Sequence, residues 1–158
     1  MQTLNLGAGR TDEEYQASEE QRRADLRDDS RTDADYFFIA AALAALGTGL
    51  FPVRVNLAVN IGAVDLLNAY GGELVRIHPL LVYSAAATWM TILVGLGFAA
   101  RSGYRWAFWA GAVLYGADMI ALSLMFSALA IGVHGFFVLR WFQGQKALQD
   151  LKDAMPLS

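Results

Sequence analysis

The feature that most constrains the fold of this chain is the uneven placement of its charges. Residues 1–35 hold ten of the fifteen acids and five of the twelve Arg and Lys residues, and the other 123 of the 158 residues hold the remaining five acids and seven bases. A typical soluble domain carries charge on about a quarter of its residues. A short charged segment followed by a long apolar block therefore indicates a helical membrane protein.

Four stretches of this block are interpreted as transmembrane helices, since a bilayer core ~30 Å thick requires about 20 residues of helix. The stretch from Trp106 to Gly144 has 39 residues, too many for one crossing but enough for two crossings joined by a tight turn near Phe126 and Ser127. We therefore predict an all-α membrane protein with four transmembrane helices. The predicted spans are residues 36–51, 80–100, 105–124 and 128–144, within a transmembrane domain of residues 35–146.

Three other segments are expected to lie outside the spans. Residues 1–34 carry mixed charge without an apolar face, which predicts a disordered or partly helical cytoplasmic tail, either a solvated leader or a docking arm for a basic partner. Residues 53–68 place Asn and Asp side chains at near-helical spacing, which predicts an amphipathic interfacial helix after the first span. Residues 147–158 form a short polar C-terminal tail, and Pro79 suits the first turn of the second span.

The Lys and Arg residues near the span ends predict the orientation in the membrane. With the N-terminus inside, ten of them lie on the inner side, and only Arg54 and Arg76 lie on the outer side. The positive-inside rule then places both termini in the cytoplasm. In this orientation Trp106, Trp109 and Trp141 would lie together at the inner interface as an aromatic belt.

Asp118 and His134 are the strongest candidate site residues, because ionisable groups at membrane depth are costly unless they are paired. If the last two spans form an antiparallel hairpin that turns near Phe126, facing positions have numbers that add to about 252, and Asp118 and His134 satisfy this sum. The pair is interpreted either as a structural clasp between the two helices or as a proton relay. The same register predicts that small residues face large ones: Gly116 with Phe136, Gly111 with Trp141, and Gly132 with Ile120.

Other chemistry receives little support from the sequence. Arg140, in the last turns of the fourth span, is expected to snorkel toward the inner headgroups or to contact a lipid phosphate. No cofactor is implied, although a haem or pigment on His134, or a haem between His78 and His134, is an alternative. The chain has no cysteine and only two histidines, which excludes thiol chemistry and a three-histidine metal site within one chain. Since the common catalytic motifs are also missing, we predict that the protein is not an enzyme.

The second half of the chain resembles a group of uncharacterised small bacterial membrane proteins with four predicted helices. The resemblance covers about residues 80–150 and is carried by Arg105–Phe108, Gly111–Asp118, His134–Leu139 and Gln143–Leu148. This chain departs from the group in its long acidic N-terminal tail and in the absence of a polar turn between the last two helices. The resemblance implies a multi-pass protein of the bacterial inner membrane, without implying an activity.

These observations lead to three hypotheses about function. The first is an accessory or interaction subunit of a membrane complex, which contacts the lipid bilayer and a protein partner or further copies of itself, and which does not bind nucleic acid. The second is an oligomeric proton-coupled transporter or channel that uses Asp118 and His134 as its titrating pair. The third is a haem- or pigment-binding subunit that uses His134 as a ligand.

Overall fold

The computed structural model describes residues 12–50, 79–123 and 128–154, and the chain is helical almost throughout these ranges. The described residues contain no strand, which confirms the all-α prediction. The predicted interfacial helix, the predicted turn at Phe126 and Ser127, and His78 lie outside the described residues. The helices are α1 (Asp12–Leu50), α4 (Pro79–Arg101), α5 (Arg105–Ser123) and α6 (Ala128–Asp153).

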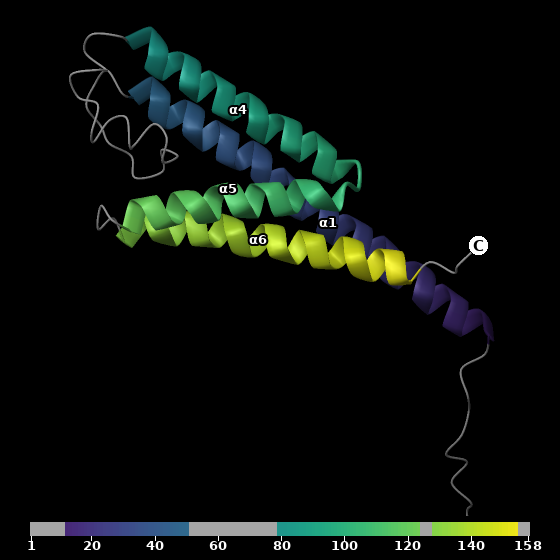
Figure 1. Ribbon diagram of the computed structural model, residues 1–158. Coiled ribbons are helices and arrows are strands. Elements are labelled where there is room, and N and C mark those ends of the chain that lie inside the picture. Colours follow the sequence, from purple (N-terminus) through teal and green to yellow (C-terminus); the bar gives the residue numbers. More distant parts are fainter. Residues whose placement is uncertain (1–11, 51–78, 124–127, 155–158) are drawn as a thin grey trace, which may run out of the picture.

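The four helices run alternately up and down, so that each is antiparallel to the one before it (Figure 1). α1 packs against α4 on one side and against α6 on the other, and α5 packs against α6 and, less extensively, against α4. The pair α1–α4 and the pair α5–α6 diverge with distance from the turn that joins α4 to α5 (Figure 1). α6 contacts both α1 and α5. It carries the acid–base contacts of His134 with Asp118 and of Arg140 with Asp33.

The turn between α4 and α5 fixes the antiparallel arrangement of these two helices. Gly103 has a φ of 86°, a left-handed conformation that a glycine adopts without the Cβ strain of other residues. The amide of Tyr104 donates to the carbonyl of Ala99 at 3.1 Å, and the amide of Gly103 donates to the carbonyl of Ala100 at 2.9 Å. These two hydrogen bonds form a Schellman motif, which satisfies carbonyls at the end of α4 and allows α5 to begin at Arg105.

α1 begins within the segment that the sequence predicts as a disordered or partly helical tail. It continues without a break through residue 34 into the first predicted span, and its 39 residues are about 58 Å long at 1.5 Å per residue. Ser30, Asp33 and Ala34 are buried, so the end of the expected tail belongs to the packed structure. Extending an existing helix costs far less than starting one, so the apolar half of α1 stabilises the charged half.

The core includes residues of all four helices, and aromatic rings fill the part where α1, α5 and α6 meet. Phe37 of α1 stacks on Trp141 of α6 with ring centroids 4.2 Å apart, and Tyr115 of α5 meets Trp141 edge-on at 4.8 Å. Trp141 is fully buried, whereas the side chains of Trp106 and Trp109 are exposed. The prediction that all three tryptophans face the membrane interface is therefore wrong for Trp141, because α1 covers it.

One stretch of the described residues, Tyr83–Arg101 in α4, is both long and apolar enough to cross a membrane. Charged or polar residues interrupt the other helices: α1 is charged over its first half, α5 carries Asp118 in its last third, and α6 carries His134 in its first third. The structure thus supports a helical protein with one candidate membrane-spanning helix.

Candidate functional site

Asp118 and His134 face each other across the α5–α6 contact. Nε2 of His134 lies 2.7 Å from Oδ2 of Asp118, and the two side chains are 1% and 9% exposed respectively. When the carboxylate is ionised, the imidazole N–H donates to it, and such a charge-assisted hydrogen bond is stronger than a neutral one. The contact predicted from the hairpin register is therefore present, and both side chains are buried.

One aromatic ring lies against His134 of this pair, and a second ring packs against the first. Tyr115 lies one helical turn before Asp118, and its ring is 4.9 Å from the imidazole of His134 at an interplanar angle of 34°. Phe137 lies 5.6 Å from the Tyr115 ring, edge-on, and is itself buried. A hydrogen bond in such apolar surroundings is electrostatically stronger than one in water, and losing one partner costs more.

The geometry of this pair allows hydrogen bonding and proton exchange. Within the described residues no three His, Cys, Asp or Glu side chains come close enough together to hold a metal ion. An Asp–His pair can fix two helices together, or it can pass a proton between carboxylate and imidazole. The geometry is common to both interpretations.

The small-residue prediction is confirmed for one pair and wrong for two. A Cβ atom added at Gly111 would lie 3.0 Å from the Trp141 ring and 2.6 Å from Cζ of Phe37, so this glycine is required for close packing. No described atom would lie within 4 Å of a Cβ at Gly116 or Gly132, so neither packs against its expected partner. Gly144, for which no partner was predicted, packs tightly against the Phe108 ring.

Arg140 is paired with an acid of α1. Its Nη2 lies 2.6 Å from Oδ1 of Asp33, its Nη1 donates to Oε1 of Gln143 at 2.9 Å, and its guanidinium lies 4.8 Å from the centroid of the Tyr36 ring. This pair was not predicted, because the sequence pattern places Asp33 in a charged tail. No local sequence signal connects the two residues, which come from opposite ends of the chain.

The environment of Asp33 disfavours its charged form. Burial raises the pKa of its carboxyl to about 6; the positive charge of Arg140 lowers it in part and the negative charge of Asp29 raises it. The Asp33 side chain is 5% exposed, whereas that of Arg140 is 30% exposed. The acid is thus the desolvated member of this ion pair.

A second ion pair joins α1 to the end of α4. Nε of Arg101 donates to Oδ1 of Asp35 at 2.6 Å, and its guanidinium lies 5.1 Å from the centroid of the Phe38 ring. Both charged side chains are nearly half exposed, so the pair contributes little to stability. The positive charge of Arg101 is nevertheless neutralised by Asp35 at this end of the bundle.

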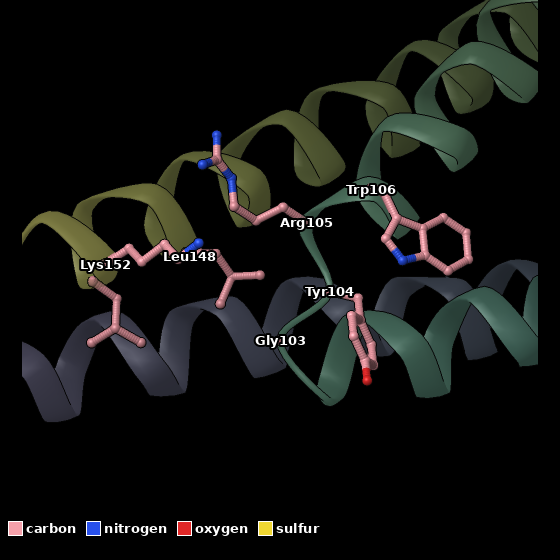
Figure 2. Close-up of a pocket in the computed structure, with 7 residues that line it drawn as sticks. Gly103, Tyr104, Arg105, Trp106, Leu148 and Lys152 are labelled. Carbon is pink, nitrogen blue, oxygen red and sulfur yellow. The ribbon is translucent and has the colours of Figure 1, made fainter.

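A hollow of about 410 Å³ lies beside the α4–α5 turn, open on one side (Figure 2). The turn and the first residues of α5 form one wall, and the last turns of α6 form the other. Arg105 and Lys152 reach toward the same region from these two walls (Figure 2). The lining residues are Gly103, Tyr104, Arg105, Trp106, Leu148, Leu151 and Lys152. The sequence analysis did not identify this hollow, because its two walls are far apart in the chain.

Comparison with models of protein families, with curated proteins and with solved structures yields no match to this chain. The resemblance to small bacterial four-helix membrane proteins therefore stays a prediction from the sequence. Function must be argued from the described residues alone.

Proposed function

We propose that this chain is a non-enzymatic, multi-pass membrane protein that acts as an accessory or interaction subunit of a membrane complex. The observation that carries the proposal is the apolar character of the outer surface. Single exposed apolar residues are common on soluble proteins, but such residues on every helix of a bundle indicate lipid or protein contact. The exposed large apolar side chains include Ile39 and Leu46 of α1, Ile92 and Phe98 of α4, Val113 and Ile120 of α5, and Phe136 and Leu139 of α6.

The burial of α4 supports placement in a membrane. Only 28% of the apolar stretch of this helix is buried within the described structure. The core helix of a soluble protein passes the same length and hydropathy test, but such a helix is mostly buried. An apolar helix that is mostly exposed is stable in lipid, where apolar side chains need no cover.

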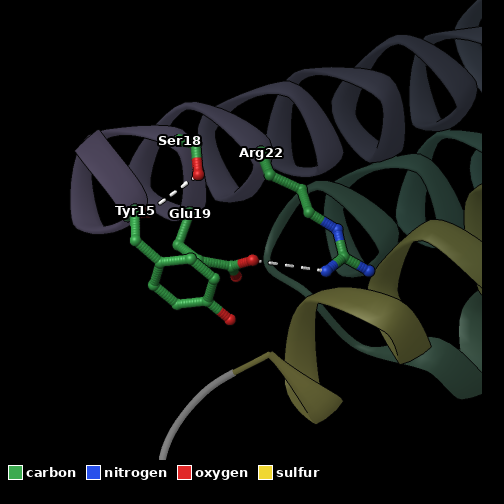
Figure 3. Close-up of polar contacts among 4 residues, drawn as sticks. All are labelled: Tyr15, Ser18, Glu19 and Arg22. Atoms are coloured by element: carbon green, nitrogen blue, oxygen red, sulfur yellow. Dashed lines mark hydrogen bonds and ion pairs between the residues drawn. The ribbon is translucent and has the colours of Figure 1, made fainter. Parts of the chain in front are cut away.

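The charged half of α1 is the part of the molecule suited to a partner. Its first turns extend beyond the end of α6 (Figure 1). The polar contacts seen there are local: the hydroxyl of Ser18 donates to the carbonyl of Tyr15 at 2.8 Å, and Arg22 lies 3.6 Å from Glu19 (Figure 3). These contacts stabilise the helix itself. Because the segment is rich in acids, a basic surface is the kind of partner that it fits.

Membrane placement is tested first, by alkaline carbonate extraction of membranes from cells that express the full chain. We expect the protein to stay in the membrane fraction, and its release into the supernatant would reject the proposal. The accessory role is tested by gentle detergent extraction followed by native mass measurement. A mass that exceeds the monomer through a bound protein subunit supports the role, and a lone monomer contradicts it.

A charge-reversal variant sharpens the second test. Glu13→Lys with Glu20→Lys reverses two exposed acids of α1 and should reduce recovery of the partner. Asp150→Lys with Asp153→Lys makes the same charge change at the end of α6 and serves as the matched control. Equal recovery with both variants would contradict a docking role for α1.

The short contact between Asp118 and His134 favours a second candidate, an oligomeric proton-coupled transporter or channel. Asp118→Asn keeps a hydrogen-bonding side chain of the same size but removes the titrating carboxyl. If the pair carries protons, a pH-dependent flux in proteoliposomes is abolished by this variant. An unchanged flux leaves the pair as a clasp between α5 and α6.

A further inference from the structure

The cationic side chains of α4, α5 and α6 differ in whether an acid is paired with them. Arg101 is paired with Asp35, and Arg140 is paired with Asp33. Within the described part of the chain, no acid lies within ion-pair distance of the Arg105 or Lys152 side chain. These two cations are also the ones that line the hollow, and none of its seven lining residues is acidic.

We infer that this hollow binds a phosphate-ester anion, presented by the headgroup of an anionic phospholipid. An arginine and a lysine that extend into one hollow without an acidic partner leave two positive charges to be neutralised from outside the chain. Guanidinium and ammonium groups are the usual protein donors to phosphate oxygens. Basic pockets between helices at the cytoplasmic side of a membrane favour anionic headgroups for the same reason.

The protein positions Arg105 for this role without satisfying its hydrogen-bonding capacity. Its Nη2 donates to Oε1 of Gln149 at 3.0 Å, which ties the guanidinium to the wall formed by α6. Arginine has five N–H donors, so this one hydrogen bond leaves donors for phosphate oxygens. Arg105 is also the first residue of α5, and the first amides of a helix lie outside its own hydrogen-bond ladder and favour anions.

The apolar lining favours a lipid over a free anion as the source of the phosphate. Leu148 and Leu151 line the α6 side of the hollow, and Tyr104 and Trp106 lie at its other side with more than half of each side chain exposed. Exposed tyrosine and tryptophan are enriched at the level of lipid headgroups. A phospholipid would place its phosphate between Arg105 and Lys152 and its glycerol and acyl chains against these apolar groups.

This inference rests on the proposed membrane placement, and the two can fail separately. Release of the protein by carbonate extraction would remove both. If the protein stays in the membrane but shows no preference for anionic lipid, only the proposed lipid site is rejected.

The test uses the full chain in a mild detergent and counts bound lipids by native mass spectrometry. The probes are phosphatidylglycerol and phosphatidylcholine with identical acyl chains. We expect phosphatidylglycerol to be retained preferentially by the wild type, and its retention to fall about fivefold for each cation removed in Arg105→Gln with Lys152→Gln. Lys146→Gln removes one charge from α6 outside the hollow and should retain the lipid as the wild type does.

A competition experiment distinguishes the sources of the phosphate. Displacement of phosphatidylglycerol by excess inorganic phosphate assigns the affinity to the phosphate group alone. Retention in excess phosphate assigns it to the intact lipid. Equal retention of the two lipids by the wild type, or equal retention of phosphatidylglycerol by the double variant and Lys146→Gln, would overturn the inference.

Photo-crosslinking of the wild type keeps the inference testable if the double variant does not fold. A phosphatidylglycerol that carries a photoreactive group near its phosphate should label residues 103–106 or 148–152. Labelling confined to the rest of the chain would show that the hollow is not the site.

Discussion

α6 carries two acid–base contacts to neighbouring helices, and they differ in burial and in the helix that supplies the acid. His134 contacts Asp118 of the neighbouring helix α5, and both side chains are buried. Arg140, less than two helical turns further along α6, contacts Asp33 of α1; there the acid is buried, but the base is 30% exposed. The first pair is enclosed, because both of its side chains are buried. The second is closed to water on one side only, and so the two pairs should respond differently to substitution and to pH.

The largest expected effect comes from breaking the enclosed pair. His134→Leu removes the imidazole that contacts the buried Asp118 carboxyl, and we expect a loss of about 4 kcal/mol in the free energy of unfolding. The double variant with Asp118→Leu removes both polar groups and should recover much of the loss. Thermal unfolding in detergent measures both effects. A double variant as unstable as the single one would show that the pair does more than compensate for its own burial.

The pH dependence of stability comes next, and it concerns the half-open pair. Asp33 has a pKa of about 6 in the folded protein against an ordinary value of 3.8, so the folded state favours its protonated form. The contribution of Asp33 to the free energy of unfolding is therefore complete below about pH 4 and is lost as the pH rises through 6. At about 1.4 kcal/mol per pKa unit, the loss is roughly 3 kcal/mol. Asp33→Asn should be flat by comparison over this range.

Unfolding of the wild type and of Asp33→Asn, measured side by side from pH 4 to pH 7, checks this prediction. Asn keeps the size of the side chain, so the difference between the two curves isolates the titration. Parallel curves would mean that the folded environment of Asp33 does not shift its pKa.

Removing Arg140 should have an intermediate effect. Arg140→Met keeps much of the apolar stem over Tyr36 but leaves the buried Asp33 carboxyl without its cation. We expect a loss of about 2 kcal/mol near neutral pH, together with a further rise in the pKa of Asp33. Arg101→Met removes the more exposed ion pair at Asp35 and is the matched control, with a loss below about 1 kcal/mol. Equal losses would mean that burial does not distinguish the two ion pairs.

Packing beside Trp141 gives a smaller effect. Gly111→Ala places a methyl group against the stacked rings of Phe37 and Trp141, and we expect a loss of about 1 to 2 kcal/mol. At Gly116 no described atom lies within 4 Å of the added methyl group, so Gly116→Ala should be neutral or stabilising by up to about 1 kcal/mol. Thermal unfolding of both variants decides whether glycine is needed at one position and not at the other.

The smallest effect is expected outside the core. Arg22 lies 3.6 Å from Glu19 on the charged half of α1, and its side chain is 60% exposed. Arg22→Ala should change the stability by less than about 0.5 kcal/mol, because exposed ion pairs gain little in water. A larger loss by thermal unfolding would indicate that this half of α1 packs more closely than its exposure suggests.

The contrast between the two contacts also explains what the sequence could predict. Asp118 and His134 belong to adjacent helices of one hairpin, so a count from an assumed turn was enough to pair them. The same count correctly paired Gly111 with Trp141 but wrongly paired Gly116 and Gly132. A count of positions fixes the depth of a residue in a hairpin, whereas contact also depends on which face of the helix the residue occupies.

Helix boundaries were predictable where a local signal marks them. Pro79 begins α4, and Arg105 follows the glycine turn and begins α5, as the sequence predicted. The charged half of α1 has no apolar face of its own, so composition alone indicated a tail. Its helical state follows from the continuous helix that it shares with the apolar half of α1, and the burial of Asp33 depends on contacts with α6 that no local pattern records. The hollow at Arg105 and Lys152 was missed for the same reason.

The continuity of α1 has a mechanical consequence. A helix without a break is stiff along its length, so Tyr15 and Phe37 belong to one rod. A protein that binds the acidic end and tilts it would also move the Phe37 ring, which stacks on Trp141. It would move Asp33, the partner of Arg140, in the same way. A displacement of the acidic end is therefore transmitted along α1 to the aromatic core.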